Sequence, residues 1–169
     1  MDGHGLSLPL QVRGQSFDIF FECAGAAMAL SDEARLMLEL LPAMRDGRPL
    51  EGGAIDARLA GSLPAIVAIY AAWVARLSEI EVSHALRADS GGKVAGKRVA
   101  TFFSGGLDSF YTLLKHQDEI TDLILVHGFD MALQEQPLQD MVSANLREVA
   151  RKTGKNLIEV RTNLRALFD

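Results

Sequence analysis

The residues with the clearest chemical potential lie together in one segment. They are Ser104, Gly105, Gly106, Leu107, Asp108 and Ser109. An apolar, β-prone stretch precedes them, and a helix-like stretch follows at residues 110–116. The unpaired backbone N–H groups and the dipole at the start of a helix favour an anion. The two glycines allow a sharp turn and a close approach of the backbone to the oxygens of the anion. The pattern therefore predicts a phosphate-binding loop.

The carboxylate of Asp108 needs a different role, because two anions repel each other. In a nucleotide site it would hold the divalent metal ion that accompanies the phosphates. The more familiar phosphate motifs, G-x-x-x-x-G-K-[ST] and G-x-G-x-x-G, do not occur in the chain. The structural alternative is a Gly-Gly turn with an aspartate cap that only links a strand to a helix.

Residues 104–109 resemble the PP-loop motif S-G-G-x-D-S of the N-type ATP pyrophosphatases, within the adenine nucleotide alpha hydrolase-like superfamily. Every position of the motif matches, and the resemblance covers residues 96–169. The family includes the asparagine synthetases and the 7-cyano-7-deazaguanine synthases. The resemblance implies a Rossmann-like parallel sheet of the HUP type, with ATP and Mg²⁺ as cofactors and a small-molecule substrate. It also implies adenylation of that substrate: a substrate oxygen attacks the α-phosphorus of ATP, pyrophosphate leaves, and an amine, ammonia or a sulfur donor then displaces AMP.

The resemblance also assigns roles to individual residues. It makes Ser104 and Asp108 the catalytic residues, Asp108 the metal ligand, and all of residues 104–109 the phosphate cradle. It places a second segment along the adenosine, where backbone atoms would contact the base: Val126, His127 and Gly128. Alternatively, His127 ends a strand and points to solvent.

Four residues nearby have both a functional and a structural interpretation. Phe129 could stack on the base, but packing is the favoured interpretation. Asp130 could bind a ribose hydroxyl, or it could form a turn. Arg161 and Arg165 could bind a phosphate or a carboxylate, or they could flank the exposed start of a helix capped by residues 162–164. We favour the helix.

The second half of the chain predicts a β-α-β-α-β order with short connections. The expected strands are residues 98–103, which read as a buried parallel strand, 121–127 and 156–160. The expected helices are residues 108–116 and 138–153. Leu138, Met141, Val142, Val149 and Ala150 should share the inward face of the second helix. Right-handed crossovers would give a parallel sheet, with ligands beyond the carboxyl ends of its strands.

The first half contains no recognisable motif but has clear local patterns. We expect a β-hairpin over residues 6–22, a helix over 31–41 that Pro42 ends or kinks, an extended piece at 50–55, a helix from 56 or 62 to 77, and a strand at 79–86. The second helix is apolar nearly all round, which predicts that it is buried and that Tyr70 and Trp73 are core residues.

We divide the chain into a small N-terminal α/β or α+β domain at residues 1–91, a linker at 92–97, and an ATP-binding α/β domain at 98–169. The sequence predicts only three strands of the family's sheet within residues 98–169. Either the chain is a fragment of a longer protein, or an oligomer partner completes the sheet, or the N-terminal half supplies strands. We favour the first. If the chain is natural, its hydrophobic edge predicts self-association.

Composition excludes several classes of protein. The chain has 169 residues, a net charge of −5 and no stripe of Lys and Arg, which argues against nucleic-acid binding. The single cysteine, Cys23, excludes a disulfide framework and is expected to be a packed residue. No signal peptide is legible and the apolar stretch 63–74 is too short to span a bilayer, so we expect no membrane partner and a cytoplasmic location. The alternative function is a nucleotide-binding regulatory module without turnover.

Overall fold

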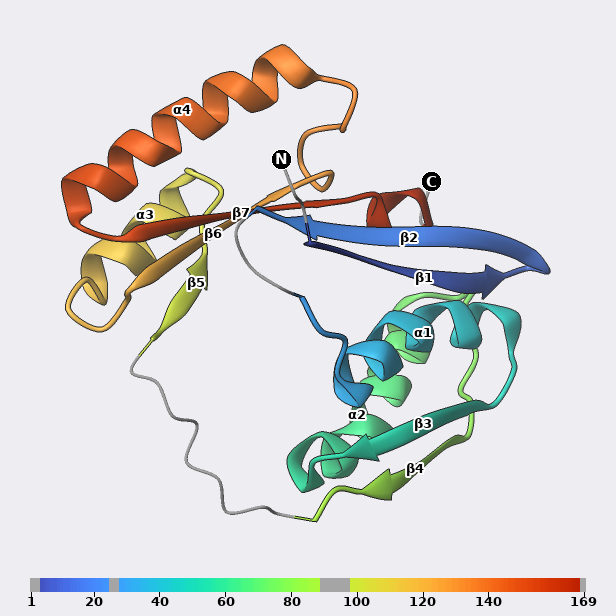
Figure 1. Ribbon diagram of the computed structural model, residues 1–169. Coiled ribbons are helices and arrows are strands. Elements are labelled where there is room, and N and C mark those ends of the chain that lie inside the picture. The colour runs from blue at the N-terminus through green and yellow to red at the C-terminus, as the bar shows by residue number, and fades with distance from the viewer. Residues whose placement is uncertain (1–3, 25–27, 89–97, 168–169) are drawn as a thin grey trace. The chain divides into compact units, whose positions relative to one another are not determined.

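The computed structural model describes residues 4–24, 28–88 and 98–167. They form a mixed α/β fold with a five-stranded sheet, in the order β1-β2-β7-β6-β5, and a separate two-stranded sheet of β3 and β4 (Figure 1). Contacts divide the chain into two units. The first comprises residues 1–7, 19–28 and 95–169, and the second comprises residues 8–18 and 29–94.

The predicted β-α-β-α-β order is present in the first unit. Its elements are β5 (Ala100–Phe102), α3 (Leu107–Lys115), β6 (Asp122–His127), α4 (Gln136–Thr153), β7 (Asn156–Thr162) and a short 3₁₀ helix, η1 (Leu164–Leu167). Strand β6 lies between β5 and β7 and pairs in parallel with both. Residues from both helices share one core with Leu123 and Leu125 of β6. The prediction of an α/β fold with parallel pairs is therefore confirmed.

The sheet is nevertheless mixed, and the prediction of a purely parallel sheet is wrong. The expected hairpin forms as β1 (His4–Val12) and β2 (Gln15–Cys23), and β2 pairs antiparallel with β7. The N-terminal half thus supplies strands to the sheet of the C-terminal half, and residues 19–24 group with the first unit rather than with a domain 1–91. The predicted linker at 92–97 lies outside the described residues.

Strand β5 is an edge strand rather than the buried strand predicted at 98–103. It is short, no described strand pairs with its outer edge, and Phe102 is 73% exposed. A continuous apolar run does not reveal whether a strand has one neighbour or two. The hairpin adds strands beside β7 and leaves the β5 edge as it was, so self-association through that edge stays a prediction.

The second unit contains α1 (Asp32–Asp46), β3 (Leu50–Ile55), α2 (Ala57–Trp73) and β4 (Val82–Leu86). The Ser31 hydroxyl caps α1 by accepting from the Ala34 amide (3.2 Å), and Gly47 ends the helix in the left-handed conformation. Pro42 neither ends nor breaks α1. It is buried in the helix beside Ala43 and Met44, and this packing offsets the hydrogen bond that a proline cannot donate.

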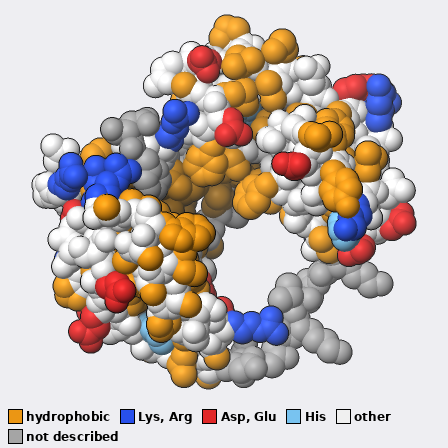
Figure 2. Space-filling view, turned by 180° about the vertical axis from the view of Figure 1, so that it is seen from behind, with side chains coloured by type: hydrophobic (Ala, Val, Ile, Leu, Met, Phe, Trp, Pro, Cys, Tyr) orange, Lys and Arg blue, Asp and Glu red, His pale blue; other side chains and the backbone are white. Residues whose placement is uncertain are grey.

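Helix α2 begins at the earlier of the two predicted positions but is not the buried helix expected. The Asp56 carboxylate caps it by accepting from the Arg58 and Leu59 amides at 2.8 and 3.0 Å. Only Leu63 and Val67 are buried, and the unit's small core covers this single stripe. Trp73 is 81% exposed, so its predicted core role, like that of Tyr70, is wrong. Hydrophobic side chains reach the surface at several places (Figure 2). In the part of the chain that the structure describes, no helix is both long and apolar enough to cross a membrane.

Candidate functional site

The predicted phosphate loop connects β5 to α3 at the carboxyl edge of the parallel strands. The buried ring of Phe103 anchors its start, since the Phe103 amide donates to the Ile124 carbonyl (2.8 Å) and the ring packs edge-on against Phe110. Gly105 then turns the chain with a φ of 80°, where an added Cβ would lie 3.1 Å from a Leu146 methyl group. The conformation favours glycine at position 105, and a Cβ there would also require the Leu146 side chain to shift slightly.

The first backbone amides of α3 have no protein acceptor among the described residues. The helix begins after Gly106, and its first hydrogen bond runs from the Phe110 amide to the Gly106 carbonyl (3.1 Å). The N–H groups of Leu107, Asp108 and Ser109 therefore remain without a described partner, and Leu107 and Asp108 are exposed to solvent. Three successive free donors at a helix start form an anion-binding arrangement.

The two serines of the loop differ in what they can still donate. The Ser104 hydroxyl accepts from the Gly106 amide (3.4 Å) and keeps its own hydrogen free. The Ser109 hydroxyl donates its hydrogen to the Gly106 carbonyl (2.8 Å). A phosphate contact donated by Ser109 would therefore require this bond to be exchanged, whereas one donated by Ser104 would not.

A cavity of about 290 Å³ adjoins the loop at the ends of β5 and β6. Its lining is mostly apolar and includes Phe102, Phe103, Ser104, Ile124, Leu125, Val126, Phe129, Asp130, Met131 and Val142. Ser104 belongs to both the loop and the cavity, so the two features form one continuous site. Apolar walls with few polar groups are typical of pockets that hold a flat organic ring.

The segment expected to lie along the adenosine is only partly directed to this cavity. Val126 lines it, and so does Phe129, which is half-exposed rather than packed. Gly128 is held by the Met131 carbonyl, which accepts from its amide (3.1 Å), and has a φ of 99°. His127 is only 4% exposed, so the alternative in which it points to solvent is wrong.

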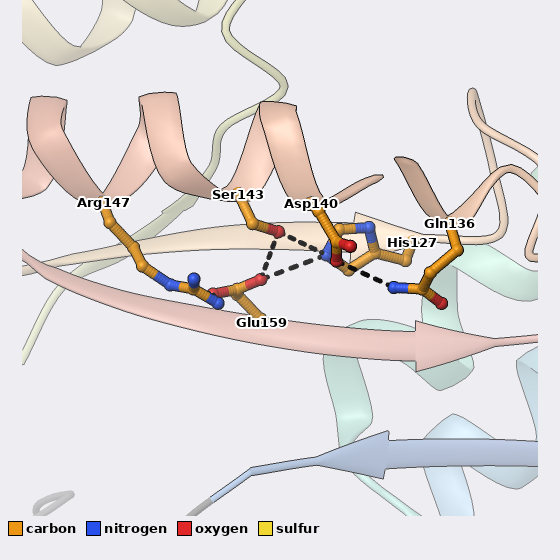
Figure 3. Close-up of polar contacts among 6 residues, drawn as sticks. All are labelled: His127, Gln136, Asp140, Ser143, Arg147 and Glu159. Carbon is orange, nitrogen blue, oxygen red and sulfur yellow. Dashed lines mark hydrogen bonds and ion pairs between the residues drawn. The ribbon is translucent and has the colours of Figure 1, made fainter. Parts of the chain in front are cut away.

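The side chain of His127 belongs to a polar cluster between α4 and β7 that the sequence did not suggest (Figure 3). Its Nε2 lies 3.2 Å from Glu159 Oε2, and Ser143 Oγ donates to the same oxygen at 2.6 Å. Arg147 donates from Nε and Nη2 to the other oxygen of Glu159, at 2.8 and 2.6 Å. Burial alone would raise the pKa of Glu159, but the hydrogen bonds from Ser143, His127 and Arg147 lower it below its usual value.

This cluster does not have the arrangement of a catalytic triad. In a triad the acid holds Nδ1 of the histidine and leaves Nε2 for the serine. Here Ser143 Oγ (3.3 Å) and Glu159 both contact Nε2, while Nδ1 is buried and has no partner among the described atoms. Because a carboxylate only accepts, Nε2 is the donor in the contact between His127 and Glu159. The cluster therefore fixes α4 on β7 and does not activate the Ser143 hydroxyl.

The predicted inward face of α4 is right in part, since Val142, Val149 and Ala150 contribute to the core. The sequence analysis nevertheless did not indicate this cluster. Leu138 and Met141 were expected inside but are exposed. The buried residues are Gln139, Ser143, Leu146 and Ala150. Their spacing is helical, but the first two are polar, and a search for apolar periodicity passes over polar positions.

The two C-terminal arginines make structural contacts. Arg161 Nη1 donates to Glu22 Oε2 on β2 (3.1 Å), and Arg165 Nη1 donates to the Phe129 carbonyl (2.9 Å). The helix start expected at residues 162–164 appears as η1, where Thr162 Oγ1 accepts from the Leu164 amide (3.1 Å). Arg165 lies in η1, as the favoured helix interpretation expected, whereas Arg161 still belongs to β7 and pairs across the sheet.

No three metal-ligating side chains gather within residues 4–24, 28–88 and 98–167. Asp108 is the exposed carboxylate of the loop. A single carboxylate suits Mg²⁺ in nucleotide sites, because phosphate oxygens and water usually complete its coordination. Cys23 is a buried free thiol, as expected. Comparisons with protein-family models, curated proteins and solved structures find no match for the chain.

Proposed function

We propose that this protein binds ATP with its 104–109 loop and adenylates a small substrate, in the manner of the PP-loop enzymes that the motif resembles. The observation that carries the proposal is the set of free amides on Leu107, Asp108 and Ser109. They follow a glycine turn at the carboxyl edge of parallel strands, where ligands bind in such sheets.

The neighbouring cavity supports an adenine nucleotide rather than a simple anion. The free amides would hold the phosphates, and the apolar walls formed by Phe102, Val126 and Phe129 would accommodate the base. Asp108 would hold Mg²⁺, which neutralises charge on the departing pyrophosphate. The chain's own part in the reaction is then positioning and electrostatic stabilisation by backbone donors and the Ser104 hydroxyl.

The test is a direct assay of the intact protein with Mg²⁺ and ATP. Binding is measured by calorimetry, and release of pyrophosphate is measured with a panel of small carboxylates and bases. We expect binding, AMP and pyrophosphate as products, and loss of product formation in Asp108→Asn. Asp118→Asn makes the same change beyond the other end of α3 and should behave like the wild type. ADP as the only product would contradict the adenylation proposal.

The alternative function is a nucleotide-binding module without turnover. Such a module would bind ATP or AMP with an affinity that Asp108→Ala leaves unchanged and would release no pyrophosphate. The assay above separates the two functions, because binding without product formation is the signature of the module.

A further inference from the structure

A second hollow, of about 610 Å³, lies beside α4 on the first unit and contains no residue of the proposed nucleotide loop. Its floor is made by polar side chains that are almost completely buried: His127, Gln139 and Ser143. The same helix exposes Leu138 and Met141. Burying polar groups while leaving large apolar ones outside costs stability, and such departures from the usual pattern concentrate at functional sites.

Most polar groups of the floor already have partners, and His127 Nδ1 is the buried atom without one among the described atoms. Glu159 accepts four hydrogen bonds, two on each oxygen, and Gln139 Nε2 donates to the Ala132 carbonyl (2.7 Å). These groups therefore shape the hollow and leave little capacity for a ligand. The charges that remain for recognition lie on its walls.

Two charged side chains of the walls, Asp140 on α4 and Arg161 on β7, are not paired with each other among the described contacts. Ser143 touches Glu159, and the chain reverses between α4 and β7 at Gly154, so the two elements run in opposite directions. Asp140 lies about one helical turn before Ser143, and Arg161 lies two residues after Glu159. Because α4 and β7 run in opposite directions, Asp140 and Arg161 come to about the same level. Asp140 and Arg161 both line the hollow, and no ion pair joins them.

Each of the two charged side chains forms a hydrogen bond with a neighbouring residue. Asp140 Oδ1 accepts from Gln136 Nε2 (2.9 Å), which leaves its negative charge without a cationic partner in the described structure. Arg161 uses Nη1 for Glu22 and keeps its other nitrogens available. The ion pair between Arg161 and Glu22 is half-exposed, and such pairs hold side chains only weakly. A ligand carboxylate can therefore join or replace Glu22.

We propose that this hollow binds a small zwitterionic molecule of the amino-acid class. Its carboxylate group faces the Arg161 guanidinium, which suits bidentate pairing, and its ammonium group faces the Asp140 carboxylate. The polar floor limits the space for the rest of the molecule. Binding requires no nucleotide, so the proposal stands apart from the function proposed for the glycine loop.

The experiment is calorimetric titration of the intact protein, without ATP, with each of the common amino acids. We expect saturable binding of at least one of them. For each binder, the matched amine without the carboxylate and the matched acid without the amine should bind at least about tenfold more weakly, because each lacks one charged contact. Asp140→Asn and Arg161→Gln should each weaken binding about tenfold.

Glu148→Gln is the matched control. This carboxylate is also on α4, but it pairs with Arg151 and Lys152 and does not line the hollow, so binding should be unchanged. Asp140 is exposed, so Asp140→Asn tests recognition without endangering the fold, and circular dichroism checks the strand pairing in Arg161→Gln. The proposal is overturned if no amino acid binds, if amine or acid analogues bind equally well, or if both variants retain full affinity.

Discussion

The two ends of strand β6 both carry buried polar groups, but they use them differently. At the amino end Asp122, only 1% exposed, accepts hydrogen bonds from Arg98, Thr121 and Asn156. At the carboxyl end, His127 keeps a buried nitrogen without a described partner, and the neighbouring α3 presents three free amides. The amino end is chemically complete, whereas the carboxyl end has donors to spare.

The difference separates polar groups that stabilise the fold from polar groups that are available to a ligand. A buried carboxylate with every lone pair engaged stabilises the sheet and offers nothing to a ligand. Amides and charges that are open to solvent bind water instead, and a ligand can replace that water. Substitutions at the amino end should therefore change stability alone, whereas substitutions around the carboxyl end should also change binding.

The largest effect is expected at the carboxyl end, from Gly128→Ala. The φ of 99° disfavours a side chain, and an added Cβ would lie only 1.8 Å from the Thr162 carbonyl oxygen. Because that neighbour is backbone, we expect a loss of about 3 kcal/mol or more in the free energy of unfolding, measured in urea. Gly154→Ala is the control, with a similar positive φ but open space around it, and should cost only about 1 kcal/mol. Equal losses would show that β6 and β7 do not approach as described.

The next effect is expected at the amino end, from Asp122→Ala. The Arg98 guanidinium, followed by hydrogen bonds from Thr121 and Asn156, holds the pKa of Asp122 well below its usual range despite the cost of burial. Removing the carboxylate eliminates the hydrogen bonds that a buried Asp122 accepts from Arg98, Thr121 and Asn156, so we expect a loss of about 2 kcal/mol at pH 7 without any change in ATP binding. Reduced nucleotide affinity in a folded variant would contradict the separation of the two ends.

The Asp122 carboxylate should also make the free energy of unfolding depend on pH. Because the folded pKa is the lower one, its stabilisation is present above the unfolded pKa, about 3.9, and is lost as the pH falls toward the folded pKa. The stability difference between the wild type and Asp122→Ala should therefore shrink below about pH 4. Urea unfolding at a series of pH values measures this, and a constant difference would exclude the proposed ion pair.

The smallest effect is expected from Ser143→Ala. The substitution removes one of four hydrogen bonds to Glu159 and leaves the other three, so we expect a loss of about 1 kcal/mol. The pKa of Glu159 should rise toward its usual value because a stabilising donor is lost. Carboxyl NMR titration measures that pKa. A pKa that does not move would show that Ser143 is not a donor to Glu159.

Local structure was largely predictable because its signals are local. Ser31, Asp56 and Gly154 mark helix ends through caps that depend only on adjacent residues. The hairpin and the β-α-β-α-β order follow from periodicity in the same way. The antiparallel pairing of β2 with β7 joins residues far apart in the sequence, and no local pattern encodes which strands become neighbours.

The candidate site was predictable in part for the same reason. Residues 104–109 are contiguous, and their free amides follow from the helix start that glycines permit. The cluster of His127, Ser143 and Glu159 spans three elements. Predicting it required knowing which polar residues of α4 are buried, and apolar periodicity does not give that. Trp73 shows the same limit in the second unit, where an apolar helix has only one stripe to bury.

The most direct test of the central claim is an NMR titration of backbone amides with Mg²⁺ and ATP. If the free N–H groups hold the phosphates, the amide resonances of Leu107, Asp108 and Ser109 should shift with saturation, and AMP should shift them less than ATP does. Amides that do not respond, or that respond less than those near Asp122 at the other end of β6, would contradict the account.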